Sequence, residues 1–203
     1  RLTEKAFTAH RVKDMEPRIR GIVVDLIEGV AARGEGCGIK DIGGPLTAHI
    51  ICEQLGLDWS RIGPEKVARW TKAVIDQIGR MQTHDEMVEN AHVMCELQNM
   101  IIAAIREREA NRREDMISDL VHAELADEAN PRLSFTEQVA TVRGFLIAGN
   151  DTTAAGIANL LLILAINPGL ADQLYEQVDN DRVMNRFVEE VLRLQPPVHG
   201  LFR

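Results

Sequence analysis

Aromatic residues, prolines and cysteines are scarce in this chain of 203 residues. Aromatic side chains make up 4% of the sequence, and there are seven prolines and three cysteines. Three cysteines without paired spacings exclude a disulfide framework and are typical of a protein from a reducing compartment. The few aromatic residues and prolines, beside many leucines, isoleucines, alanines and glutamates, favour α-helices over strands.

The chain also lacks an excess of positive charge and a long uncharged apolar run. Its net charge of -8 excludes non-specific nucleic-acid binding. Acids interrupt the arginines of residues 106–113, which is typical of a solvated helix face. The longest apolar run, residues 157–166, is half of the ~20 residues that span a bilayer. Since no signal peptide is recognisable either, we expect a soluble cytoplasmic protein that binds neither nucleic acid nor a membrane.

Apolar residues recur with helical spacing along most of the chain. The pattern predicts helices over residues 15–32, 45–55, 62–81, 85–108, 115–125, 134–166, 168–178 and 181–194. A capping box of Ser134 and Glu137 opens the longest of them. Residues 37–42 could form one short strand. No repeat or change in composition marks a boundary, so we expect a single, mainly α domain over residues 1–203.

The centre of the longest predicted helix is poorly suited to a helix. It reads Ala-Gly-Asn-Asp-Thr-Thr over residues 148–153. Gly, Asp and Thr are weak helix formers, and a Thr hydroxyl can bond back to the carbonyl one turn earlier and bend the helix. Such a defect in an apolar helix indicates a use. The residues predict a local groove where a small ligand meets a proton-delivering pair, Asp151 and Thr152.

Several blocks of residues resemble motifs of the cytochrome P450 family. Residues 148–153 resemble the oxygen-activation motif of its I helix, and Glu190 to Arg193 resemble the Glu-x-x-Arg motif of its K helix. Residues 196–203 resemble the Pro-Pro-Val…Arg continuation, and residues 1–17 resemble the end of the C helix. The chain is identified as a member of the soluble bacterial type. The resemblance implies the central part of the P450 fold, with a long I helix and minor β elements.

The resemblance implies a monooxygenase that uses haem b (iron protoporphyrin IX) to insert one atom of dioxygen into a small, fairly apolar substrate. Electrons would come from a ferredoxin, a flavin-dependent reductase or a fused reductase domain. Thr152 would accept a hydrogen bond from bound dioxygen or an ordered water, and Asp151 would relay protons. Ala148 and Gly149 would be small so that haem and dioxygen can approach the helix.

Other residues take implied roles around this centre. Arg203 matches an arginine that binds a haem propionate, where a planar bidentate donor suits a carboxylate. Ile147 and Val198 fall where the family lines its substrate pocket, and a plain core role is the open alternative for both. Glu190 and Arg193 match a buried structural ion pair. Their spacing alone predicts a surface pair.

The family holds its haem iron through a cysteine in a glycine-rich loop beyond the K helix. None of Cys37, Cys52 and Cys95 lies in such a sequence, so we expect the metal ligand outside this chain. The chain then corresponds to about the middle half of a monooxygenase and is expected to be inactive alone. The rival hypotheses are a haem-free helical scaffold or small-molecule binding protein with the same fold, and a truncated product without function.

One further pattern, on the predicted helix over residues 85–108, could be interpreted as a metal site. Glu89, His92 and Glu96 share a helix face and could contact a metal ion. Solvated pairs at this spacing are far commoner than metal ligands. We therefore expect no metal-binding residue in this chain.

Overall fold

The architecture is entirely helical in the part of the chain that a computed structural model describes, which is residues 9–79, 82–124, 132–198 and 200. No strand occurs among these residues, which confirms the mainly α prediction. The elements in chain order are α1 (Ala9–Arg33), η2 (Gly38–Gly43), α2 (Gly44–Leu55), α3 (Trp59–Gly79), α4 (His84–Ala110), α5 (Met116–Val121), α6 (Phe135–Ile166), α7 (Pro168–Tyr175) and α8 (Asp181–Leu194).

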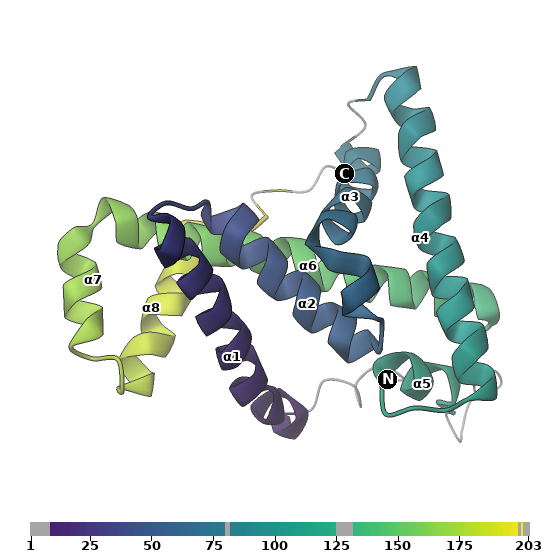
Figure 1. Cartoon of the computed structure of the whole chain (residues 1–203), viewed down its shortest axis with the longest axis horizontal. Helices are drawn as coiled ribbons and strands as arrows, with labels where there is room; N and C mark the ends of the chain where they lie inside the picture. The colour runs from purple at the N-terminus through teal and green to yellow at the C-terminus, as the bar shows by residue number, and fades with distance from the viewer. Residues whose placement is uncertain (1–8, 80–81, 125–131, 199, 201–203) are drawn as a thin grey trace.

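Helix α6 is the axis of the molecule (Figure 1). Helices α2, α3 and α4 pack along its first half and middle, η2 lies on its second half at Ala154, Ala158 and Leu161, and α7 and α8 fold back on its far end. The predicted start is confirmed, because Ser134 and Glu137 form a capping box. The Glu137 carboxylate accepts from the Ser134 amide over 2.8 Å, and the Ser134 hydroxyl accepts from the Glu137 amide over 3.4 Å.

The predicted strand over residues 37–42 is wrong, because this segment forms the π-helical turn η2. The Asp41 carboxylate accepts from the Cys37 amide over 2.6 Å and from the Arg33 guanidinium over 2.6 Å, and these bonds fold the chain back on itself. The turn then lies directly on α6. A Cβ atom on Gly43 would lie 2.8 Å from the carbonyl oxygen of Ala154.

Helix α3 contains a break that the sequence pattern did not predict. Gly63 has φ 70° and ψ 168°, so residues 59–62 form a separate turn before the main helix. Pro64 follows, and proline suits the first turn of a helix because it has no amide hydrogen to leave unpaired. The predicted helix over 62–81 is therefore the second part of α3, and residues 80 and 81 lie outside the described residues.

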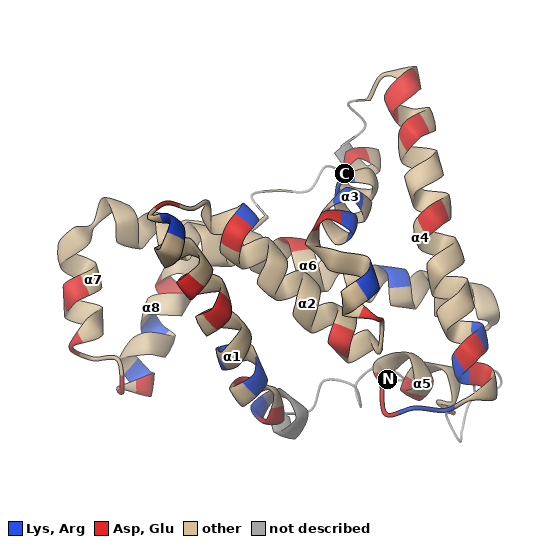
Figure 2. Cartoon of the chain, in the orientation of Figure 1, with Lys and Arg blue, Asp and Glu red and all other residues tan. Residues whose placement is uncertain are grey.

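One hydrophobic core fills the space between α2, α3, α4, α5 and the first half of α6. Its largest fully buried side chains include Leu55, Trp70, Leu97, Ile101 and Leu146. The second half of α6 is packed far less. Figure 2 shows that most of α6 carries no charge, while the charged residues gather on other helices.

Length and composition alone would let α6 cross a membrane. Its most apolar 18-residue stretch has a mean hydropathy of 1.3, and 22% of that stretch is buried. The shorter run of residues 157–166 did not reveal this, because the apolar character continues on both sides of Asp151. The other helices pack along α6, and one helix of this kind is by itself weak evidence for a membrane span.

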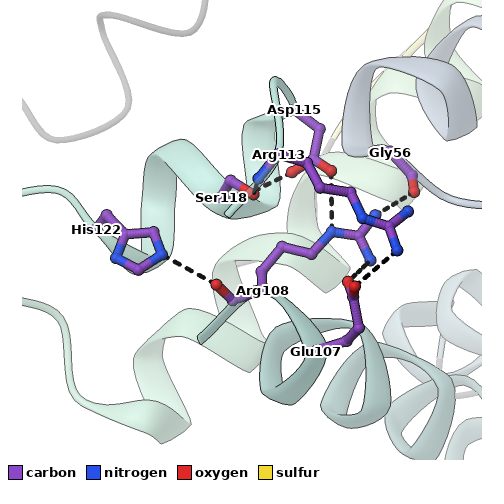
Figure 3. A network of polar contacts seen from close by, with 7 residues as sticks. All are labelled: Gly56, Glu107, Arg108, Arg113, Asp115, Ser118 and His122. Carbon is purple, nitrogen blue, oxygen red and sulfur yellow. Dashed lines mark hydrogen bonds and ion pairs between the residues drawn. The ribbon is translucent and has the colours of Figure 1, made fainter. Parts of the chain in front are cut away.

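A buried ion-pair network joins the ends of α2, α4 and α5 (Figure 3). The Arg108 guanidinium donates to the Asp115 carboxylate over 2.9 Å, and both side chains are almost fully buried. Arg108 also donates to the carbonyl oxygen of Gly56 over 2.5 Å. Asp115 caps α5 by accepting from the Ser118 amide over 2.7 Å. The attraction within a buried pair offsets its desolvation cost only while both partners are in place, and removing one partner leaves an uncompensated charge.

The close approach of α2 to this network gives the first prediction. Gly56 ends α2 with φ 71°, and a Cβ atom there would lie 2.1 Å from Asp115 Oδ2. Gly56→Ala must displace the carboxylate from Arg108, so we expect the free energy of unfolding to fall by about 3–5 kcal/mol. Chemical denaturation measures this loss.

The matched control is Gly34→Ala. Gly34 has φ 77° but nothing within 4 Å of the added atom. We expect the free energy of unfolding of this variant to fall by only roughly 1–2 kcal/mol, which is the cost of a left-handed backbone at a residue other than glycine. Equal losses for the two variants would contradict the claim that the Asp115 contact, rather than the glycine conformation, dominates at Gly56.

Candidate functional site

The segment 148–153 lies in the middle of α6, and the helix continues through it without a break. The weak helix formers there are accommodated by one side-chain bond. The Thr152 hydroxyl donates to the carbonyl oxygen of Ala148 over 3.0 Å. This is the back-bond that the sequence suggested for its threonines. A hydroxyl that donates in this way keeps its lone pairs free to accept.

One face of this segment is packed against α2 and η2. A Cβ atom on Gly149 would lie 3.0 Å from Cδ1 of Ile51, and Ala154 touches Gly43. The small size of Gly149 therefore has a packing reason on the side of α2. Its predicted role beside haem and dioxygen stays a prediction.

A polar residue that sequence reasoning missed lies on the same face. Asn150 is 6% exposed and bonds to Thr47 of α2 over 2.8 Å and to Thr71 of α3 over 3.1 Å. The signal was present in the sequence, because an asparagine between glycine and aspartate in an apolar helix needs hydrogen-bond partners when it is buried.

The opposite face of the segment is open. Ala148 and Asp151 are exposed, and Thr152 is half-buried. Within the described residues, no hydrogen bond or ion pair engages the Asp151 carboxylate. The structure thus brings the predicted acid and hydroxyl side by side on a face that a ligand can reach.

An apolar groove begins at Thr152 and runs between α6 and α8. Its volume is about 440 Å³, on the scale of small-molecule sites. The lining residues are Thr152, Thr153, Gly156, Ile157, Leu160, Val188, Val191, Leu192 and Pro197. The amide of Asn159 donates to the carbonyl oxygen of Gln195 over 2.9 Å, which holds the segment after α8 against α6.

The other predicted site residues lie away from the groove or outside the described part. Ile147 is 8% exposed and belongs to the hydrophobic core, which is its alternative role. Val198 is 49% exposed and does not line the groove. Arg203 lies outside the described residues.

Glu190 and Arg193 form an exposed ion pair on α8. Nε of Arg193 donates to the two carboxylate oxygens over 3.1 and 2.9 Å. The hydrogen bond from Arg193 lowers the pKa of Glu190. The side chains are 58% and 65% exposed, so the structure gives the surface pair that spacing alone predicts.

None of the three cysteines lines the groove. Burial raises the pKa of the Cys52 thiol to about 12, which disfavours the thiolate that binds a metal. Cys37 and Cys95 are exposed on η2's N-terminal side and on α4. No group of His, Cys, Asp and Glu among the described residues could hold a metal ion, and this includes Glu89, His92 and Glu96.

Comparisons with known proteins agree with these motifs. The sequence profile of the family "Cytochrome P450" matches residues 70–203. The chain is 34% identical to "Cytochrome P450 107B1" of Saccharopolyspora erythraea, over 100% of this chain and 47% of that protein. It is 31% identical to "Cyclomarin C epoxidase CymV" of Salinispora arenicola, over 97% of this chain and 48% of that protein.

A solved structure shows the same fold. The chain superposes on cytochrome P450 CYP109Q5 from Chondromyces apiculatus with a TM-score of 0.76 and 31% identity, over 100% of this chain and 47% of that one. The chain therefore spans about half the length of the relatives that it matches.

The packed face of α6 gives a second prediction. Gly43→Ala would place a Cβ atom 2.8 Å from the Ala154 carbonyl oxygen, and backbone cannot give way cheaply. We expect it to lower the free energy of unfolding by about 1–3 kcal/mol. Gly144→Ala, at an open position of α6, should instead raise it by about 0.4–1 kcal/mol. Denaturant titrations of both variants check the contrast, and a neutral Gly43→Ala would contradict the close packing.

The cysteines give a third prediction. Hydrogen bonds from the backbone amides of Lys40 and Ile39 lower the pKa of the exposed Cys37 thiol. The thiolate is the reactive form, so Cys37 should react quickly with an alkylating reagent at pH 8, while Cys52 stays unmodified until the protein is unfolded. Mass spectrometry of the separate peptides measures both rates. Modification of Cys52 in the folded protein at a rate near that of Cys37 would show that Cys52 is not buried.

Proposed function

The chain belongs to the cytochrome P450 family, and we propose that it carries the oxygen-activation segment of a haem-dependent monooxygenase. Such an enzyme inserts one atom of dioxygen into an organic substrate and reduces the other to water with two electrons and two protons. The observation that supports this most is the pairing of Asp151 with Thr152 on the open face of α6, beside an apolar groove.

The groove and the open face suit an apolar, flat cofactor such as haem b on this side of α6. Ala148 and Thr152 would lie against it, and when bound it supplies the activation of dioxygen. None of Cys37, Cys52 and Cys95 lines the groove, so a different cysteine would supply the thiolate that binds the haem iron. The predicted contact of Arg203 with a propionate belongs to the same proposal.

The chain's own residues would handle protons. The Thr152 hydroxyl donates to the Ala148 carbonyl and can still accept a hydrogen bond from dioxygen or an ordered water. Asp151 is exposed, so its carboxylate can take a proton from solvent and release it towards the Thr152 side. The opposite face of α6 is packed against α2 and η2, and this packing holds Asp151 and Thr152 in fixed positions during proton transfer.

Substrate, electron donor and location complete the proposal. A small, fairly apolar substrate would lie beside the cofactor on the open face of α6, where the predicted contact with Val198 belongs to the same proposal, while a contact with Ile147 would require this core residue to be uncovered. The described residues include no glycine-rich nucleotide loop, so electrons would come from a ferredoxin, a flavin-dependent reductase or a fused reductase domain. The matched relatives are bacterial, which supports a soluble cytoplasmic enzyme.

A haem-free scaffold or binding protein with this fold is the less favoured candidate. An apolar groove alone would suit it, but a scaffold has no reason to present Asp151 and Thr152 together on an open face. The two candidates separate in one absorption measurement. We expect the dithionite-reduced, full-length protein to show the strongly red-shifted Soret band of thiolate-bound haem with carbon monoxide. A colourless protein, or only an unshifted band, would contradict the proposal.

The proton pair gives a fourth prediction. In the haem-loaded enzyme, Asp151→Asn and Thr152→Val should each lower the rate of product formation by roughly 10²-fold or more, because proton delivery is impaired. The substrate for this assay is a small apolar compound chosen by its shift of the haem absorption band. Product and dioxygen consumption are measured together.

Thr153→Val is the control, since Thr153 is also a hydroxyl at the edge of the groove but is not part of the proposed relay. It should keep product formation within a few-fold of the wild type. A loss at Thr153→Val as large as at Thr152→Val would mean that the groove, rather than the Asp151–Thr152 pair, is disturbed.

A further inference from the structure

Three buried polar side chains from three helices meet behind the open face of α6. Asn150 of α6 is 6% exposed, and Thr47 of α2 and Thr71 of α3 are each 5% exposed. Thr47 donates to Asn150 Oδ1 over 2.8 Å, and Asn150 Nδ2 donates to Thr71 over 3.1 Å. The Thr47 hydroxyl is shared with the carbonyl oxygen of Gly43 at 2.9 Å. The Asn150 carboxamide thus links α2 and α3 to α6, and the Thr47 hydroxyl extends the network to η2.

Hydrophobic burial cannot set the rotation of α6 about its own axis very firmly. Apolar residues lie on all sides of this helix, so different rotations bury similar apolar area. Burial is also non-directional. The two hydrogen bonds of Asn150 are directional, and their partners sit on helices fixed by the rest of the core. Together with the close contacts at Gly43 and Gly149, they therefore select one rotation.

We infer that Asn150 is a positioning residue, which fixes the rotation of α6 so that Thr152 faces the groove and Asp151 stays on the open face beside it. Successive helical residues differ by about 100°, so a modest rotation would turn the Asp151 carboxylate out of its place. The use of this arrangement in proton delivery rests on the proposed function. The rotation itself does not.

Cysteine reporters measure the rotation without haem or turnover. Asp151→Cys and Thr153→Cys place thiols on positions about 200° apart around α6. The tryptic peptide of residues 144–182 contains none of the native cysteines, so labelling of each reporter with methyl methanethiosulfonate is read there alone. The rates are compared, in the full-length protein, between the native Asn150 and Asn150→Leu.

We expect Asn150→Leu to change the two labelling rates in opposite directions, with a severalfold shift in their ratio. A general loosening of the fold would raise both rates together, and that result would overturn the inference. Unchanged rates would overturn it as well. The carbon monoxide spectrum tests the proposed function separately, because neither measurement depends on the outcome of the other.

A triple variant separates positioning from stability. Asn150→Leu alone leaves the Thr47 and Thr71 hydroxyls buried with a partner missing, which lowers the melting temperature and can prevent folding. Thr47→Val, Asn150→Leu and Thr71→Val together remove all these polar atoms with little change in shape, so the melting temperature should recover towards that of the wild type. The labelling ratio should stay shifted. Recovery of both would mean that Asn150 only fills the core, and the inference would be wrong.

Discussion

The close contact of η2 and α2 with one face of α6 is the constraint on which the rest of the structure depends. Gly43 and Gly149 have no side chain at the points where the helices come nearest, and a Cβ atom at either would meet its neighbour at 3.0 Å or less. Because this face is sealed, the opposite face of the same helical turns is the one left for a ligand. This one close contact therefore determines which face of α6 lies against the core and which face stays open.

Two buried polar networks stabilise this packing in different ways. The Arg108–Asp115 pair holds helix ends together at the edge of the core, where Arg108 also satisfies the carbonyl group of Gly56 directly after α2. The Asn150 bridge lies in the middle of the core and carries no charge. A neutral bridge costs less to bury than an ion pair, and it avoids a strong field next to Asp151. The charged network stands away from the proposed chemistry, at the other end of α2.

The sequence predicted the helices well because amphipathic periodicity and caps are local signals. Ser134, Glu137 and the end of α6 at Ile166 are where the pattern put them. The prediction of a strand failed at residues 37–42. The turn there depends on Asp41 accepting hydrogen bonds from Cys37 and Arg33 and on contact with α6, and neither can be seen in so short a stretch of sequence. The pair Asp151–Thr152 was predicted from the motif, and its role in proton delivery is a proposal. The partners of Asn150 were not predicted, since Thr47 and Thr71 lie far from it in the chain.

The two halves of α6 differ in what covers them within this chain, which spans about half the length of the relatives that it matches. The first half is buried in the core, while Leu162 and Ile166 in the second half are 53% and 67% exposed. The groove next to Thr152 is lined almost entirely by apolar side chains. Any group that covers this surface contributes roughly 25 cal/mol for each Å² of apolar area removed from water. A cofactor bound in the groove would therefore stabilise the α6–α8 region by mass action, so that occupancy of the site and order of the helices around it rise together.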